Sequence, residues 1–579
     1  MTGTSSSMST RGSPVRRLWD RRLDHYPSTR PRLAYLGIVV LATIVVYYEL
    51  YVVGAVGPSI IQQYGMSFRY FVDVSVFSAV AGAFASLLAG ASDRYGRANL
   101  VTFGLLVTGV LTAFAVPNAG NETVFLVLVV LIGFVEGIIL VATPAMVRDF
   151  SPQLGRAVAM GFWTLGPVVG SLVVAAVSSN TLPANLGVHP HAWKGQFVTA
   201  GVTGIGVFVV ALLFLRELSP GLRDQLMVSA RDRALIEAKA AHLDVEAGHR
   251  QPWRQMLHLD IIGSAFAISV FLLIYFAAVF FFVVYFTTTF GFTEKQANGI
   301  ADWFWACDAG ALIFVGVLSD LTRVRKPFMV LGAIGAVIMT IIFLGKTSDP
   351  HTGYYSFVWI VSLLALSLGV AYGPWMAGFT ETVERRNPAL TATGLAVWAW
   401  ILRVVVATSA FVLPFVVSSA TPLVTYGPTA QAIAAKFPTQ IQTIQVIQPK
   451  VIDALAANSS DAAAATTALS EVKSALGVSS SEALTRLLAL KTLPKADLAF
   501  LQAHGAALSA AQKSNPSQWR RWWWVCVVGE LVFLPLLLIM AGRWSPRAAK
   551  RDADEHDRLV TAELAKLTAE TDAPTLSVS

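Results

Sequence analysis

The chain has 579 residues, of which 55% are hydrophobic and 13% are charged, whereas a soluble globular domain has about 25% charged residues. So few charges cannot cover the surface of a soluble enzyme of this length, which excludes that class of protein. Disordered and fibrous chains are also excluded, because the apolar residues come in runs of about 18 or more, the length that a bilayer requires. The composition therefore predicts an all-α polytopic membrane protein.

Residues 1–32 are basic. They carry seven arginines against two aspartates and lie directly before an apolar run, which is typical of a segment on the cytoplasmic side of a membrane. This placement favours a membrane-flanking tail over a nucleic-acid-binding one, although the net charge of the chain is +8. The apolar run itself is too long for a cleavable signal peptide and lacks a small-residue cleavage site.

Twelve apolar runs follow, in two groups of six. They lie near residues 33–57, 72–89, 99–117, 124–146, 157–177 and 197–215, and then near residues 259–287, 297–318, 327–346, 354–378, 389–416 and 522–542. We predict that each run is a transmembrane helix. Lysine and arginine are concentrated in alternate short loops, so we expect a multi-pass protein of the plasma (inner) membrane with both termini in the cytoplasm.

The runs divide the chain into seven predicted segments. These are a basic cytoplasmic tail (1–32), an N-terminal six-helix bundle (33–215), a charged cytoplasmic linker (216–258), helices 7 to 11 of a C-terminal bundle (259–416), an insertion (417–518), helix 12 (519–544) and a polar cytoplasmic tail that we expect to be disordered (545–579). The insertion is rich in Ala, Ser and Gln, and its apolar residues recur at helical spacing. We predict a small external domain of amphipathic helices, whose role the sequence leaves open.

The two groups of six helices are related by an internal repeat. Asp93 lies in the sequence GASDRYGR after the second run, and Asp320 lies in GVLSDLTR after the eighth. Further along, Pro144 and Pro374 each begin a Pro-x-Met motif at nearly the same spacing. A six-plus-six repeat predicts two pseudo-symmetric bundles, which is the architecture of alternating-access transporters.

The loop after the second run resembles the cytoplasmic loop signature of the major facilitator superfamily. The residues that carry the resemblance are Gly90, Asp93, Arg94, Gly96 and Arg97, with a weaker copy at Gly316, Asp320 and Arg323. In this family, the Asp and Arg of the loop hold helix ends together when the binding site faces outward. The resemblance therefore implies a secondary transporter in which these residues form a gate. A carboxylate beside a helix amino terminus and a basic cluster suits such a breakable contact.

Six ionisable side chains lie inside the predicted helices, where charge is costly and each one is a functional candidate. They are Glu49, Glu136, Asp302, Asp308, Arg403 and Glu530. Five acids share one arginine, so some of the carboxylates lack a cationic partner. Loss of hydration favours the neutral form of such a carboxylate, which can then exchange a proton near neutral pH. We therefore predict that these acids couple transport to protons.

Glu49 is the first candidate for proton coupling, with Glu136 or Asp308 assisting. The segment from Glu49 to Pro58 resembles the first helix of the aromatic-acid and related organic-acid proton symporters, in which an acid is followed by Leu-x-x-x-Gly-Ala-Val-x-Pro. Those symporters usually carry a second acid three residues earlier, where this chain has Val46. The alternative interpretation is that Glu49 is a pore-lining acid with a structural partner.

Arg403 is the first candidate for solute binding. Its spacing from Thr393 and Gly394 resembles that in the eleventh helix of the same symporters. A guanidinium near the middle of the membrane can bind a carboxylate through two parallel hydrogen bonds. The alternative interpretation is an internal salt bridge to Glu530 or Asp308 that fixes helix packing.

An acid and three aromatic residues complete the predicted solute site. Asp302 and Asp308 share the eighth helix, and their spacing of six residues places them on faces about 120° apart. We expect Asp308 to point inward as the deeper residue, and Asp302 to contact solute near the outer mouth. The aromatic candidates are Tyr48, Tyr372 and Trp398, whose rings suit an organic solute.

Three consecutive tryptophans, Trp522 to Trp524, begin the twelfth run directly after two arginines. We predict that all three lie in the interfacial belt of the membrane rather than in the protein interior.

Two further functions stay open. Gly166, Pro167 and Gly170 resemble the fifth-helix motif of drug:proton antiporters, which favours export of drugs or lipophilic compounds. Against this, Gly133 occupies the position of the antiporter arginine in the fourth helix. The remaining possibility is a transporter-like sensor or assembly partner that acts through the insertion.

The sequence contains no Walker loop, and its histidines are not clustered at metal-ligand spacing, so we expect neither an enzyme nor a bound cofactor. The expected partners are protons, a small organic solute and the lipid bilayer, without nucleic acid, and the protein is expected to be monomeric. The favoured prediction is a proton-coupled transporter for a small, carboxylate-bearing organic solute. The sequence does not decide between symport and antiport.

Overall fold

The computed structural model describes residues 21–87, 96–150, 155–184, 191–222, 252–349, 351–386, 390–458 and 461–572. Within these residues, twelve helices are long and apolar enough to cross a membrane. The prediction of an all-α fold with twelve transmembrane helices is therefore confirmed. The strands β1 (Arg22–Leu23) and β2 (Glu217–Leu218) pair in parallel and form a two-stranded sheet.

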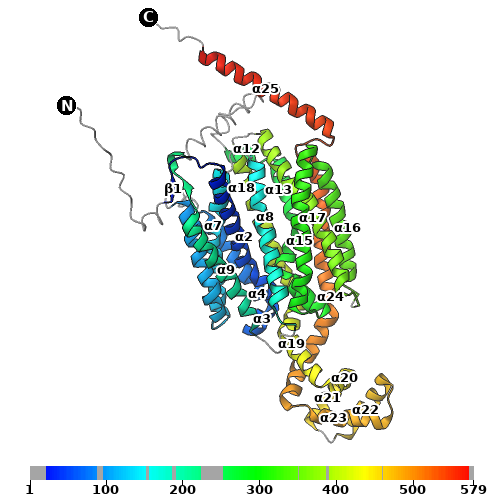
Figure 1. Ribbon diagram of the computed structural model, residues 1–579. Helices are drawn as coiled ribbons and strands as arrows, with labels where there is room; N and C mark the ends of the chain where they lie inside the picture. The colour runs from blue at the N-terminus through cyan, green and yellow to red at the C-terminus, as the bar shows by residue number, and fades with distance from the viewer. Residues whose placement is uncertain are drawn as a thin grey trace, which may run out of the picture.

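The spanning helices form two halves that lie side by side (Figure 1). The N-half consists of α2 (Thr29–Ala55), α4 (Phe68–Leu87), α6 (Arg97–Val110), α7 (Glu122–Phe150), α8 (Gly155–Thr181) and α9 (Ala192–Phe214). The C-half consists of α13 (Leu259–Phe271), α14 (Leu273–Phe290), α15 (Glu294–Thr322), α16 (Lys326–Lys346), α17 (Tyr354–Arg386), α18 (Thr391–Val416) and α24 (Lys495–Leu536). Helices α13 and α14 together make one span.

The surface along which the two halves meet is called the seam here. Helix α8 packs on α15 across it, α2 packs on α14, and α4 packs on α18. Helix α14 is apolar on nearly every side, because it is surrounded by α2, α15 and α24 and leaves little surface to lipid or water. Where α2 meets α14 the backbones are very close, since a Cβ atom at Gly54 would lie 2.5 Å from the carbonyl oxygen of Val279. Only glycine fits at this point of the seam.

The two ends of the bundle carry different structures (Figure 1). At one end, called the insertion face, lie α3 (Gly57–Tyr64) and the helices of the insertion, which are α19 (Ala420–Lys436), α20 (Pro438–Val446), α21 (Pro449–Ala457), α22 (Ala462–Leu476) and α23 (Ser480–Ala489). At the other end, called the terminal face, lie β1, α12 (Pro252–Met256) and α25 (Pro546–Asp572).

The insertion is helical and has a small core of its own, built around Ile447, Ala468, Val472 and Ala483. Its last part differs from the expected boundary. Helix α24 begins at Lys495 and runs without interruption for 42 residues, about 63 Å, which is roughly twice the thickness of a membrane core. The segment 495–518, assigned to the insertion from the sequence, is therefore an extension of the twelfth helix, because its alanine-rich sequence favours a helix up to and through Pro516.

Within the described residues, parts of both predicted tails form structure that was not expected from the sequence. Arg21 is 1% exposed, and its Nη1 donates hydrogen bonds to Thr102 Oγ1 and to the carbonyl of Ala211, each at 2.9 Å. Burial lowers the pKa of Arg21 to about 10. At the other end, most of the tail expected to be disordered is the polar helix α25, because it is rich in alanine, leucine and charged residues that favour a helix.

The tryptophans at the start of the twelfth run do not form an interfacial belt. Trp522 and Trp523 are 3% and 0% exposed, and Trp524 is the one that reaches the surface. The ring of Trp523 lies 5.1 Å from those of Tyr285 and Phe343, between α14 and α16. The sequence prediction was wrong for Trp522 and Trp523, because their side of α24 packs against neighbouring helices of the C-half.

Candidate functional site

Four tyrosines gather at the seam, two from each half. Tyr47 and Tyr51 lie one turn apart on α2, with ring centroids 5.4 Å apart, and Tyr275 of α14 and Tyr372 of α17 face them from the C-half. The phenol groups are close enough to influence one another electrostatically. Trp305 of α15 packs edge-on against Tyr275 at 5.0 Å. This tyrosine cluster combines apolar ring faces with hydroxyl groups, which is the kind of lining that an organic solute requires.

Asp308 and Arg403 are the charged residues of the C-half that lie nearest to the tyrosine cluster. Asp308 is 2% exposed and faces Gly369 of α17, where a Cβ atom would lie 2.9 Å from its Oδ1. Its carboxyl acts electrostatically on Tyr275 and Tyr372. Arg403 of α18 is exposed and acts electrostatically on Tyr47. The structure therefore brings both predicted residues to the place where the two halves meet.

The internal salt bridge considered for Arg403 is not formed. Its Nη1 lies 3.5 Å from Ser86 Oγ of α4, across the seam, and the described part of the chain places no carboxylate within ion-pair distance of it. Glu530 instead accepts a hydrogen bond from Thr340 Oγ1 at 2.7 Å, on the contact between α24 and α16. The guanidinium of Arg403 is thus available to a ligand from outside the protein.

Glu49 and Glu136 are buried inside the N-half, 2% and 1% exposed. Glu49 lies two residues from both Tyr47 and Tyr51, which turns it about 200° away from them around α2. Its carboxylate contacts the Cα side of Gly204 on α9, where a Cβ atom would overlap Oε1. It therefore points between α6 and α9 rather than into the seam.

Neither carboxylate has a hydrogen-bond donor among the described residues. Thr108 is the hydroxyl beside Glu49, but its Oγ1 bonds to the carbonyl of Leu105 at 3.4 Å. Glu136 of α7 acts electrostatically on Tyr47 and Tyr51, and it is also coupled to Glu49. Glu136 is thus close enough to interact electrostatically with Glu49 and with two phenols of the tyrosine cluster.

The remaining aromatic candidates lie outside the tyrosine cluster. Tyr48 is 2% exposed, and its hydroxyl has no partner among the described residues. Trp398 is buried in the C-half, where its ring lies 5.6 Å from that of Trp375, and Trp375 in turn stacks on Tyr372 at 6.2 Å. Trp398 therefore supports the wall of the cluster through Trp375.

Polar side chains close the seam at the insertion face. Glu294, at the start of α15, accepts hydrogen bonds from the backbone nitrogen of Ser59 at 2.7 Å and from its Oγ at 2.8 Å. One turn further along α15, Asn298 Nδ2 donates to the carbonyl of Ala55 at 2.9 Å. Glu294 and Asn298 are 1% and 2% exposed. These bonds join the C-half to the end of α2 and the start of α3 in the N-half.

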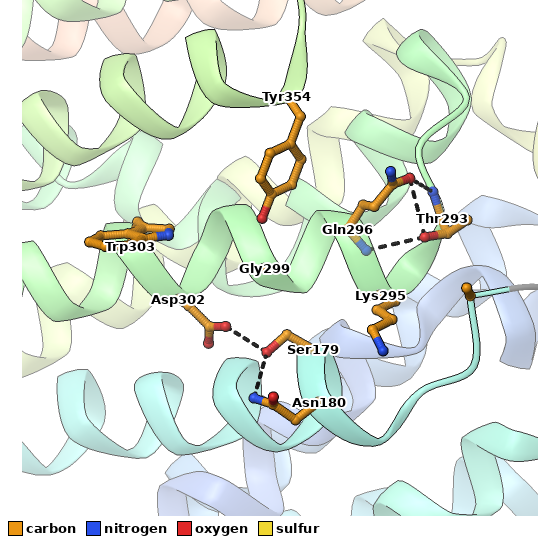
Figure 2. Close-up of a pocket in the computed structure, with 10 residues that line it drawn as sticks. Ser179, Asn180, Thr293, Lys295, Gln296, Gly299, Asp302, Trp303 and Tyr354 are labelled. Carbon is orange, nitrogen blue, oxygen red and sulfur yellow. Dashed lines mark hydrogen bonds between the residues drawn. The ribbon is translucent and has the colours of Figure 1, made fainter.

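Asp302 belongs to the same closed edge of the seam. Its Oδ2 accepts a hydrogen bond from Ser179 Oγ of α8 at 2.5 Å (Figure 2). It lines a pocket of about 500 Å³ at the insertion face, apart from the tyrosine cluster. Glu294 and Asn298 were not among the residues predicted from the sequence. Glu294 follows Thr293 of a capping box and has the pattern of an ordinary acid of a first helical turn.

The gate motif lies at the terminal face. Gly90, Asp93 and Arg94 lie outside the described residues. Gly96 has a φ of +92°, and a Cβ atom there would contact Glu217 Oε1. Arg97 forms an ion pair with Asp149, with Nη1 and Oδ2 2.6 Å apart.

The second copy of the motif is held by a residue that was not among the candidates. Arg325 pairs with Asp320 at 2.6 Å and with Glu381 at 3.1 Å, whereas Arg323 adopts a left-handed backbone at the end of α15. A Cβ atom at Gly316 would meet nothing within 4 Å. In both halves an arginine at the start of the third or ninth span therefore pairs with an acid at the end of the fourth or tenth.

Comparison with known proteins agrees with this architecture. The family model of the Major Facilitator Superfamily matches residues 39–410, and no curated protein sequence matches the chain. A bacterial homologue of the human lysosomal transporter Spinster, inward-facing and occupied, superposes with a TM-score of 0.54 at 15% identity, over 90% of this chain and 100% of that one. The proton:xylose symporter XylE, bound to 6-bromo-6-deoxy-D-glucose, superposes with a TM-score of 0.51 at 13% identity, over 68% of this chain and 90% of that one. The chain belongs to the Major Facilitator Superfamily, and it is a multi-pass secondary transporter rather than an enzyme.

Proposed function

We propose that the chain transports a small, carboxylate-bearing organic solute in a proton-coupled cycle of alternating access. The observation that carries this proposal is the pair of buried acids in the N-half. Glu49 and Glu136 are buried without a cation or a hydrogen-bond donor among the described residues, so each is costly to keep charged. A proton taken up by Glu136 lowers that cost, and Tyr47 and Tyr51 place this step next to the solute.

The solute enters the proposal through Arg403. Its guanidinium lies at the seam beside the tyrosine cluster and is not neutralised by a described carboxylate. An arginine in this situation favours a planar anion that accepts two hydrogen bonds, which is a carboxylate. The rings of Tyr47, Tyr275 and Tyr372 then suit the organic part of the molecule. The likeness to a proton:xylose symporter supports proton coupling in this fold and not the choice of solute.

Drug export is the second candidate function, and the fifth-helix glycines that favoured it have a packing role. A Cβ atom at Gly166 would lie 2.6 Å from Thr43 Cγ2, and one at Gly170 would lie 2.6 Å from Tyr47 Cβ. Both glycines thus let α8 approach α2 closely, as small residues do in many membrane proteins. Their presence is accounted for without an exported drug.

The proposed cycle opens and closes the two faces in turn. The seam is closed at the insertion face, and we propose that this face lies outside a plasma (inner) membrane with both termini in the cytoplasm. Solute and a proton would then exchange with the cytoplasm at the terminal face. Opening toward the insertion would require Glu294 and Asn298 to separate from the N-half.

Transport in liposomes tests this function. The purified protein is reconstituted, an inward proton gradient is imposed, and benzoate and tetraphenylphosphonium are followed separately. We expect benzoate to accumulate in step with the gradient. Glu49→Gln and Glu136→Gln should abolish accumulation while retaining benzoate counterflow, because binding persists without a titratable group. Glu122→Gln, an acid in the first turn of α7, is the control.

Three results would contradict the proposal in distinct ways. Accumulation by Glu49→Gln and Glu136→Gln at the wild-type level would exclude these acids as the coupling site. Movement of tetraphenylphosphonium against protons would favour the antiporter. If neither compound moves, the remaining hypothesis is a transporter-like sensor that acts through the insertion. Replacement of residues 437–494 by a flexible linker tests it, because α20 to α23 have a core of their own and can be removed as a unit.

A further inference from the structure

The pocket at the insertion face has an arrangement of charges that the transport cycle does not use. It has a volume of about 500 Å³ and lies between α8 of the N-half and α15 and α17 of the C-half. Lys295 and Asp302 both line it. They are seven residues apart on α15, which puts them on nearly the same side of the helix but about 10 Å apart along it. The pocket is therefore positive at one end and negative at the other.

Neither charge is satisfied by the other. No ion pair joins Lys295 to Asp302 or to another described carboxylate. Ser179 donates to Oδ2 of Asp302, but Oδ1 is buried without a donor among the described residues. A buried carboxylate oxygen without a donor costs free energy, and a cation that binds the Asp302 carboxylate from the pocket offsets part of that cost.

The wall between the two charges is shaped for a small organic chain. Gly299 lies between them on α15, and the hydroxyl of Tyr354 lies over it, 2.6 Å from where a Cβ atom would be (Figure 2). Tyr354 and Trp303 add aromatic side chains to the lining of the pocket.

From these observations we infer that the pocket is a second ligand site, and that it takes a small zwitterion with its ammonium group and its carboxylate several bonds apart. The ammonium group binds the carboxylate of Asp302, and the carboxylate of the ligand binds Lys295. The apolar chain between them lies along Gly299 and Tyr354. Binding at this site does not depend on the proposed function.

The position of the pocket gives the site a consequence for transport. Its walls come from both halves, with Ser179 on α8 and Asp302 on α15, and they must separate when the seam opens at the insertion face. A ligand that contacts both walls binds the closed state better than the open one, so it shifts the equilibrium toward the closed state. The zwitterion therefore slows transport without competing for the tyrosine cluster.

Equilibrium binding of 6-aminohexanoate to the purified full-length protein tests the site, with hexanoate and hexylammonium as analogues that each lack one charge. We expect 6-aminohexanoate to bind at least about tenfold more tightly than either analogue, since each analogue lacks one charge-assisted hydrogen bond. Asp302→Asn and Lys295→Gln should each weaken its binding by about tenfold or more. Asp349→Asn and Lys346→Gln, an exposed ion pair on the same face, are the matched controls.

Each result of the binding measurements either supports or overturns the second ligand site. Equal binding of the three compounds, or unchanged binding to Asp302→Asn and Lys295→Gln, would overturn the inference. Gly299→Ala is a second variant that keeps both charges but places a methyl group 2.6 Å from the Tyr354 hydroxyl, in the wall between them, and it should also weaken binding. In liposomes, 6-aminohexanoate should slow benzoate flux by wild type and not by Asp302→Asn. If no solute is transported, the binding measurement stands alone, which separates failure of the site from failure of the proposed function.

Discussion

The insertion face and the terminal face are held together by different kinds of contact. At the insertion face, Glu294, Asn298 and Asp302 of the C-half each form a hydrogen bond to the N-half. At the terminal face, the ion pairs of the described residues stay within one half, as in Arg97 with Asp149 and Arg386 with Asp260. The bonds at the insertion face must break when the halves rock apart there, whereas those at the terminal face need not.

This difference separates two kinds of contact. One kind sets the equilibrium between the two transport states, and the other stabilises each half. Contacts across the seam are counted in the free-energy difference between the two transport states. Contacts within a half are present in both states and contribute to the stability of that half alone. Four predictions separate the two kinds of contact, and the first three use the same distance measurement. Spin labels at exposed positions 181 and 355 report the separation of the halves at the insertion face, in a protein with Cys307→Ser and Cys526→Ala.

The largest effect is expected from Gly54→Val. Its side chain would collide with the carbonyl of Val279, 2.5 Å from the added Cβ atom, so the seam could not close. Overpacking of this kind costs about 1–3 kcal/mol or more, which corresponds to about a 5- to 150-fold shift of the equilibrium. The label distance should lengthen and transport should fall to background. Gly37→Val, on the same helix with open space around it, is the control. An unchanged label distance in Gly54→Val would show that the contact between α2 and α14 does not control closure of the seam.

Glu294→Ala should shift the same equilibrium less strongly. It removes two hydrogen bonds from Ser59 to a buried carboxylate, and bonds to charged groups are worth about 1.5–3 kcal/mol each at most. When the insertion face opens, water replaces part of these hydrogen bonds to Glu294. The two bonds therefore shift the equilibrium between the closed and open states by less than their sum. We expect a longer label distance and a lower solute affinity at the terminal face. Glu122→Ala changes an acid of a first helical turn that lies within one half, and an equal response of both variants would refute the special role of Glu294.

Arg97→Gln and Arg325→Gln should lower stability without changing the label distance. Both arginines are largely buried and pair with acids of their own half, and breaking a buried pair costs about 3–5 kcal/mol, less for the more exposed acids of Arg325. The measurement is thermal unfolding in detergent together with the label distance. A longer label distance at normal stability would mean that the ion pairs of the terminal face affect opening of the seam. That result would contradict the distinction between the two faces.

The smallest effect is expected from Asp349→Asn, which removes an ion pair that lies at the insertion face but within the C-half. The backbone N–H of His351 and then the ammonium group of Lys346 hold the pKa of Asp349 below its ordinary value. Since the pKa is lowered by folding, the stabilisation is present above the ordinary pKa and is lost as the pH falls through the folded pKa. The unfolding temperature of the variant should be slightly lower at neutral pH and equal to that of wild type in acid. A constant difference across the pH range would contradict this assignment.

Several features of the site could be predicted from the sequence alone. The repeat and the loop signature indicated the family, and the spacing along α2 already puts Glu49 on the opposite side of the helix from Tyr47 and Tyr51. The sequence could not show which neighbours those sides meet. Glu49 contacts α9 because Gly204 leaves room for it, and that room is a property of the packed bundle.

The amino-acid sequence by itself determined the number of spans, their approximate limits and the pairing of the two halves, because a bilayer demands long apolar runs and a duplicated sequence repeats them. Only the tertiary structure decided which polar residues close the seam. Glu294 and Glu122 are both acids in the first turn of a helix on the same face, and nothing local distinguishes them. Glu294 joins the two halves because packing places it opposite Ser59. The role of an ionisable residue in the bundle thus depends on the partner that packing places beside it.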